Sequence, residues 1–91
     1  MYNKKYILEK IEEFGEHNYI YDDMKDCVCY LAYFNVGERG WFLQESENYF
    51  GFISTHRIQT STVKNVEYFI DYIIVETNNT KLTFRLITDW N

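Results

Sequence analysis

The chain has 91 residues, 46% of them hydrophobic and 20% aromatic, so it has room for one domain with a packed core and differs from disordered proteins. Its formal net charge of −5 argues against the phosphate contacts that dominate nucleic-acid binding. No apolar run approaches the roughly 18 residues of a membrane span, and the first residues contain no secretory signal. We therefore expect one domain, residues 1–91, in the cytoplasm and without nucleic-acid or membrane contacts.

An amphipathic helix is predicted over about residues 4–14. Apolar residues recur there with the 3.6-residue period of one helix face, namely Ile7, Leu8, Ile11 and Phe14. The charges oppose the helix dipole, because the lysines come first and most of the glutamates last. This order is interpreted either as an ordinary solvated face or as an acidic surface kept for a basic partner.

Acidic and tyrosine side chains gather in this segment and in the connector that follows it. Residues 1–30 carry four lysines against seven acids, which makes the N-terminal third the acidic end. The plain interpretation of residues 16–26 is a polar turn. The sharper hypothesis is a contact surface for a basic protein, formed by Glu9, Glu12, Glu13, Glu16, Tyr19, Tyr21, Asp22, Asp23 and Asp26.

The rest of the chain predicts strands. Residues 27–36 are apolar on both faces and predict a central strand covered on both sides. Gly51 inside a strand suggests a bulge or a close backbone approach, and a break is expected at residues 56–57. The strands are expected at about residues 27–36, 41–45, 49–55, 58–67, 71–77 and 80–87. The predicted fold class is α+β: an N-terminal amphipathic helix packed on a twisted, mainly antiparallel sheet of about five or six strands.

Residues 71–87 predict a β-hairpin. Two runs rich in β-branched and aromatic residues flank Asn78 and Asn79, which favour a type I′ turn. With these two residues in the turn, the expected pairs on the outer face are Glu76 with Lys81 and Tyr72 with Arg85. The preceding turn, residues 68–71, is unusually apolar, and its side chains either fold over the core or stay exposed as a contact surface.

The residues with nucleophilic or metal-binding side chains do not form a recognisable motif. Cys27 and Cys29 lie in the most apolar run, where a cysteine is usually an inert small hydrophobe. Their spacing, and that of His17 and His56, does not match a zinc site. We predict no catalytic residues, no metal site and no cofactor.

Residues 60–67 and 74–84 together resemble the C-terminal β-meander of small phage-encoded proteins, and the acidic, tyrosine-rich composition is similar to that of anti-CRISPR proteins. This resemblance implies a non-enzymatic inhibitor from a phage or mobile element that occludes a basic host protein, such as a defence nuclease, in the host cytoplasm. One alternative is a homo-oligomeric accessory protein, such as a homodimer, assembled through an exposed strand edge. A second alternative is a small-molecule-binding or hydrolytic domain that uses His56 with cysteine and tyrosine residues.

Overall fold

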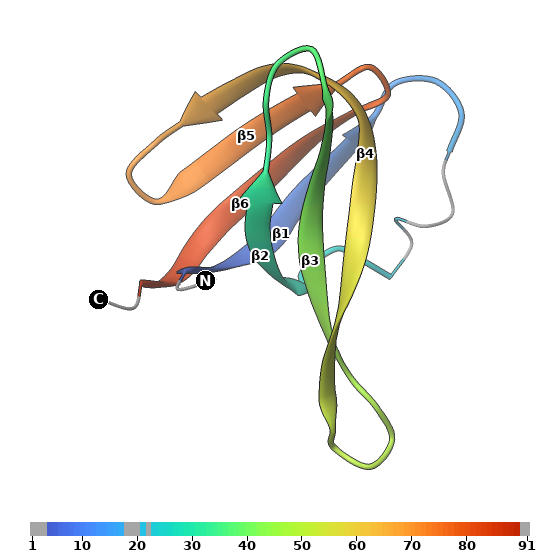
Figure 1. Cartoon of the computed structure of the whole chain (residues 1–91), viewed down its shortest axis with the longest axis vertical. Coiled ribbons are helices and arrows are strands. Elements are labelled where there is room, and N and C mark those ends of the chain that lie inside the picture. The colour runs from blue at the N-terminus through green and yellow to red at the C-terminus, as the bar shows by residue number, and fades with distance from the viewer. Residues whose placement is uncertain (1–3, 18–20, 22, 90–91) are drawn as a thin grey trace.

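The computed structural model describes residues 4–17, 21 and 23–89. Six antiparallel strands form one sheet, and each pairs with the next strand in the chain. The last strand pairs with the first, so the sheet closes into a barrel (Figure 1). Within the described ranges there is no helix of the length and apolarity that crossing a bilayer requires. The strands are β1 (Lys4–Glu13), β2 (Val28–Tyr33), β3 (Arg39–Glu47), β4 (Ile53–Tyr68), β5 (Tyr72–Thr77) and β6 (Thr80–Asp89).

The predicted α+β class and its N-terminal helix are wrong, because residues 4–13 form β1, which closes the barrel against β6. Tyr6 and Leu8 are buried on the inner face, as alternation in a strand requires. The β1–β6 register then shifts between Leu8 and Lys10, and Ile11 rather than Lys10 packs against the core. One extra residue in a strand therefore produced an apolar spacing of three that imitates a helix.

The reversed charge order of this segment also has a simple explanation in a strand. A β-strand has almost no net dipole, so lysines at its start and glutamates at its end carry no penalty. The carboxylate of Glu9 instead forms an ion pair with Arg85, whose Nε donates to it at 2.7 Å. Glu12 lies opposite Lys81 and 3.8 Å from Lys10. The outer wall of β1 and β6 is therefore a surface of mixed charge.

Strand β4 is longer than predicted, because the expected strands at 49–55 and 58–67 are largely one strand of 16 residues. The break expected at His56 and Arg57 is absent, since both residues pair with β3. Residues up to Thr62 pair with β3 and those from Val63 pair with β5, so β4 passes from one neighbour to the other. Gly51 lies in the turn before β4. The predicted central strand is β2. In the closed barrel no strand is central, and Cys29 is the one fully buried residue of β2.

The β5–β6 hairpin has the predicted register, with Tyr72 opposite Arg85 and Glu76 opposite Lys81. The Glu76 carboxylate forms its ion pair with Lys64 at 3.7 Å. The predicted type I′ turn is wrong, because neither asparagine has the positive φ that it requires. The Thr77 hydroxyl organises the turn instead, accepting hydrogen bonds from the backbone N–H groups of Asn79 at 3.2 Å and Thr80 at 3.0 Å.

The core fills the barrel with side chains from all six strands, and Tyr21 and Met24 of the β1–β2 connection join it. Phe42 and Phe84 meet edge to face with ring centroids 5.2 Å apart. Phe34, from the β2–β3 turn, lies 6.0 Å from Phe84. Aromatic pairs of this kind add about 0.5–1.5 kcal/mol beyond the area they bury. The buried apolar side chains are Tyr6, Leu8, Tyr21, Met24, Cys29, Phe42, Ile58, Val63, Val75, Leu82 and Phe84.

Candidate functional site

A polar cavity of about 710 Å³ opens at one end of the barrel. We call it the mouth. Four parts of the chain meet there: the end of β1 with the β1–β2 connection, the start of β3, the middle of β4, and the β5–β6 turn. Its volume falls within the range of about 300–1,000 Å³ that is common for ligand pockets. The lining is Glu13, Phe14, Glu16, His17, Tyr21, Arg39, Gln59, Ser61, Thr62, Asn78, Asn79 and Thr80.

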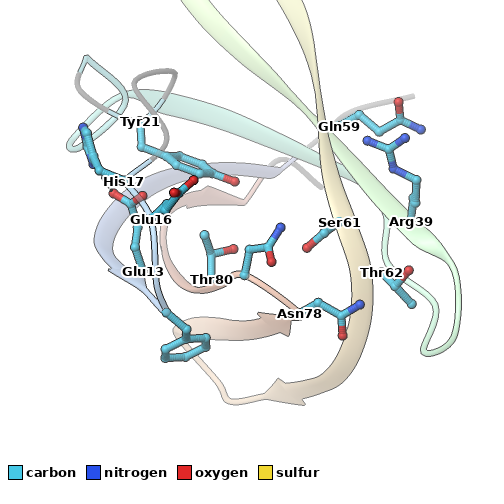
Figure 2. A pocket seen from close by; sticks show the side chains of 12 residues that line it. Glu13, Glu16, His17, Tyr21, Arg39, Gln59, Ser61, Thr62, Asn78 and Thr80 are labelled. Carbon is cyan, nitrogen blue, oxygen red and sulfur yellow. Dashed lines mark hydrogen bonds and ion pairs between the residues drawn. The ribbon is translucent and has the colours of Figure 1, made fainter.

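One side of the mouth is acidic. Figure 2 shows Glu13, Glu16, His17 and Tyr21 together on this side. The Glu13 carboxylate lies 2.7 Å from Nδ1 of His17, whereas Glu16 is exposed and forms no ion pair or hydrogen bond with another described residue. Burial raises the pKa of the Tyr21 phenol, a hydrogen bond with Thr80 opposes that shift, and the charge of Glu13 adds to it. Tyr21 therefore stays a neutral hydroxyl at this side of the mouth.

The opposite side of the mouth in Figure 2 carries Arg39, Gln59 and Thr62. Nε of Arg39 donates to the backbone carbonyl of Thr60 at 3.0 Å, which fixes the guanidinium at the start of β3. The two terminal amino groups of this guanidinium make no hydrogen bond or ion pair within the described ranges. Because arginine stays protonated in proteins, this side of the mouth offers a permanent positive charge with donors to spare.

Hydroxyl and amide groups lie between the two charged sides, as Figure 2 shows for Ser61, Asn78 and Thr80. The Ser61 Oγ is buried and has no hydrogen-bond partner among the described residues. A buried polar atom without a partner costs about 1–3 kcal/mol. The wall of the mouth therefore contains a buried hydroxyl whose hydrogen-bonding capacity the fold leaves unused.

The structure distributes the acidic and tyrosine residues of the predicted partner surface over three places. Glu9 and Glu12 lie on the mixed-charge outer wall, whereas Glu13, Glu16 and Tyr21 line the mouth. Tyr21 is only 8% exposed, so its ring belongs to the core and not to a free surface. The predicted role of the whole set in partner binding stays a prediction.

Two other acids of that set, Asp23 and Asp26, lie in the β1–β2 connection. Asp23 and Asp26 are exposed near Cys27, whose thiol donates to the Asp23 carbonyl at 3.1 Å. Tyr19 and Asp22 lie outside the described residues.

A second feature is the arm, which we define as residues 45–55, the far part of the β3–β4 hairpin. Figure 1 shows it projecting beyond the barrel at the end away from the β5–β6 turn. Its tip is aromatic and exposed: Tyr49 is 97%, Phe50 80% and Phe52 70% accessible. Exposed apolar patches on a small domain usually mark an interaction surface.

The tip has a defined backbone. The Asn48 side-chain oxygen accepts hydrogen bonds from the N–H groups of Phe50 at 2.9 Å and Phe52 at 3.0 Å. Asn48 also closes the turn through its backbone, donating to the carbonyl of Phe52 at 2.9 Å. Gly51 has a φ of 84°, a conformation that favours glycine. The rings of Tyr49 and Phe50 meet edge to face at 5.6 Å. The aromatic side chains are therefore presented by a preorganised loop.

The apolar turn between β4 and β5 is exposed, which answers the question that the sequence left open. Ile70 is 99% and Tyr68 69% accessible. Phe69 is partly covered, because its ring stacks on that of Tyr72 with centroids 4.3 Å apart. This second patch is separate from the tip of the arm in Figure 1.

The alternative of a small-molecule-binding or hydrolytic domain uses His56 with cysteine and tyrosine residues, but neither thiol nor His56 lines the mouth. Burial raises the pKa of the Cys29 thiol to about 12, so it stays protonated and inert. His56 lies on β4, near the arm, with Nε2 3.0 Å from the Ser46 hydroxyl. Among the described residues, no group of three histidine, cysteine or acidic side chains is placed to hold a metal ion.

The strands predicted at residues 41–45 and 49–55 cover part of the arm, but neither its projecting aromatic tip nor most of the mouth was predicted. The signals for the arm were present, since Asn48 before Tyr49 and Phe50, followed by Gly51, is typical of a turn with aromatic residues at its tip. The same aromatic run predicts a strand at residues 49–55, because aromatic residues also favour strands. No local signal marks the mouth, because its two sides come from β1 and β3, which only the closed barrel brings together.

No protein-family model matches this chain, and neither a curated protein nor a solved structure is significantly similar to it.

Proposed function

We propose that this protein is a non-enzymatic binding module that contacts another protein through the tip of the arm. The observation that carries this proposal is the exposure of three neighbouring aromatic side chains on a turn fixed by Asn48. Aromatic residues are enriched among the few residues that dominate binding energy. A loop that is already ordered loses little conformational entropy when it binds.

The chemistry of the partner follows from the charge. The net charge is −5, and exposed Glu47 lies directly before the tip turn, so a partner with a basic surface is favoured by long-range attraction. The narrower proposal is that a phage or mobile element supplies this protein to occlude a basic nuclease of a host cell, in the cytoplasm. The sequence resemblance and the negative charge support it.

The test compares capture of a basic partner from a bacterial lysate by the wild-type protein and by the double variant Tyr49→Ser/Phe50→Ser. The matched control is Ile70→Ser, which removes an equally exposed apolar side chain from the other patch. The control should retain the partner identified with the wild type. The double variant should lose about 2 kcal/mol or more, a roughly thirtyfold weaker affinity, with unchanged melting temperature.

Three results would contradict the proposal. The first is full retention of the partner by the double variant, which would place the contact elsewhere. The second is binding of the wild-type protein to lipid vesicles through the tip of the arm, which would make the tip a membrane anchor. The third is light scattering that shows a concentration-dependent dimer of the wild type and a monomer of the double variant, which would make the tip a contact between two copies of this chain.

A further inference from the structure

We propose that the mouth of the barrel binds a short peptide with free termini, its ammonium group at the acidic side and its carboxylate at Arg39. This inference is independent of the arm, because the two features share no residue and lie at opposite ends of the molecule (Figure 1). It rests on the polarity of the mouth, on the unused donors of Arg39 and on the unpartnered hydroxyl of Ser61.

The charges of the mouth are separated. Glu13 and Glu16 lie on one side, and Arg39 lies on the other (Figure 2). An anion alone would meet the two carboxylates, and a cation alone would meet the guanidinium. A dipolar ligand satisfies both sides at once, and a peptide with free ends carries its opposite charges at its two termini.

Arg39 is built to receive the carboxylate. The hydrogen bond from its Nε to the Thr60 carbonyl holds the guanidinium plane in place, while the terminal amino groups stay available. A guanidinium binds a carboxylate through two parallel hydrogen bonds, which fix orientation as well as charge. On the other side Glu16 is exposed and close to Glu13, so a carboxylate is available for the ammonium group.

The centre of the mouth suits peptide groups better than apolar ones. The Ser61 hydroxyl lacks a partner, and the side chains of Asn78 at the centre and of Gln59 beside Arg39 (Figure 2) offer both donors and acceptors. Backbone amides of a ligand supply complementary donors and acceptors between its charged ends. The volume of about 710 Å³ accommodates a ligand of several residues.

The experiment is an NMR titration of the labelled wild-type protein with di-, tri- and tetraglycine, which carry no side chains. We expect at least one of them to shift the backbone amide signals of Ser61, Thr62 and Thr80 with saturation in the millimolar range. Two blocked peptides serve as ligand controls, N-acetyl-triglycine without the ammonium group and triglycine amide without the carboxylate. Each should bind about tenfold more weakly, because each lacks one charge-assisted interaction.

Two variants test which side of the mouth binds each end of the peptide. Glu16→Gln should abolish the preference for triglycine over its N-acetyl form, and Arg39→Lys should reduce the preference over the amide. Both substitutions are at exposed positions, and unchanged spectra away from the mouth would show that the fold is intact. The proposal is overturned if none of the glycine peptides shifts the mouth signals, if both blocked peptides bind as well as triglycine, or if neutral glucose gives the same shifts.

Discussion

At Gly40 the backbone of β3 lies against the ring of Phe34, the aromatic side chain that the β2–β3 turn adds to the core. A Cβ at this position would lie 2.5 Å from Cδ1 of that ring and 3.0 Å from the carbonyl oxygen of Tyr33. A contact of 2.5 Å essentially never occurs in folded proteins, so a side chain at position 40 forces the ring or the strand to move. Gly40 is therefore required for this packing.

Replacing this glycine should destabilise the protein. We expect Gly40→Ala to lower the free energy of unfolding by about 1–3 kcal/mol, the usual cost of overfilling a core, as measured by urea denaturation. In the background of Phe34→Leu the same change should cost less, because the displaced ring is gone. An unchanged denaturation midpoint for Gly40→Ala would show that the ring does not pack there.

At the scale of the element, β1 differs most from its prediction. In a helix the neighbours Ile7 and Leu8 share one apolar face, whereas in a strand they point to opposite sides. Leu8 is fully buried and Ile7 is only partly covered. The two side chains therefore report which element residues 4–13 adopt.

Alanine substitution at Ile7 and at Leu8 distinguishes a strand from a helix over residues 4–13. Leu8→Ala should cost about 2–5 kcal/mol, as expected for a fully buried leucine. Ile7→Ala should cost about 1 kcal/mol or less. Denaturant unfolding of both variants measures the difference, and similar losses at the two positions would argue against the strand.

Local patterns predicted those elements whose alternation is uninterrupted. The register of the β5–β6 hairpin was correct because its two runs alternate without a break and meet across a short turn. The helix predicted for residues 4–13 was wrong because one register shift changes the spacing of the apolar residues. A similar shift near Thr60 in β4 places Ile58, Thr60 and Val63 on the buried side, which simple alternation does not produce.

At the scale of the whole molecule, closure of the barrel separates two candidate binding surfaces. The polar mouth forms at one end, and the aromatic arm projects from the other (Figure 1). The acidic side chains behind the net charge of −5 are not gathered in one place, because those of β1 lie partly on the outer wall and partly in the mouth. Sequence analysis could not predict the mouth because its residues are adjacent only after β1 has paired with β6.

The pairing of β1 with β6 determines the fold and the mouth together, and backbone NOE spectra test it most directly. In the barrel, backbone protons of Leu8 and Phe84, and those of Ile11 and Leu82, should give cross-strand NOEs. The Cα shifts of residues 4–13 should be those of extended chain. Strong NOEs between successive amide protons through residues 4–13, without contacts to β6, would show a helix and contradict the closed barrel.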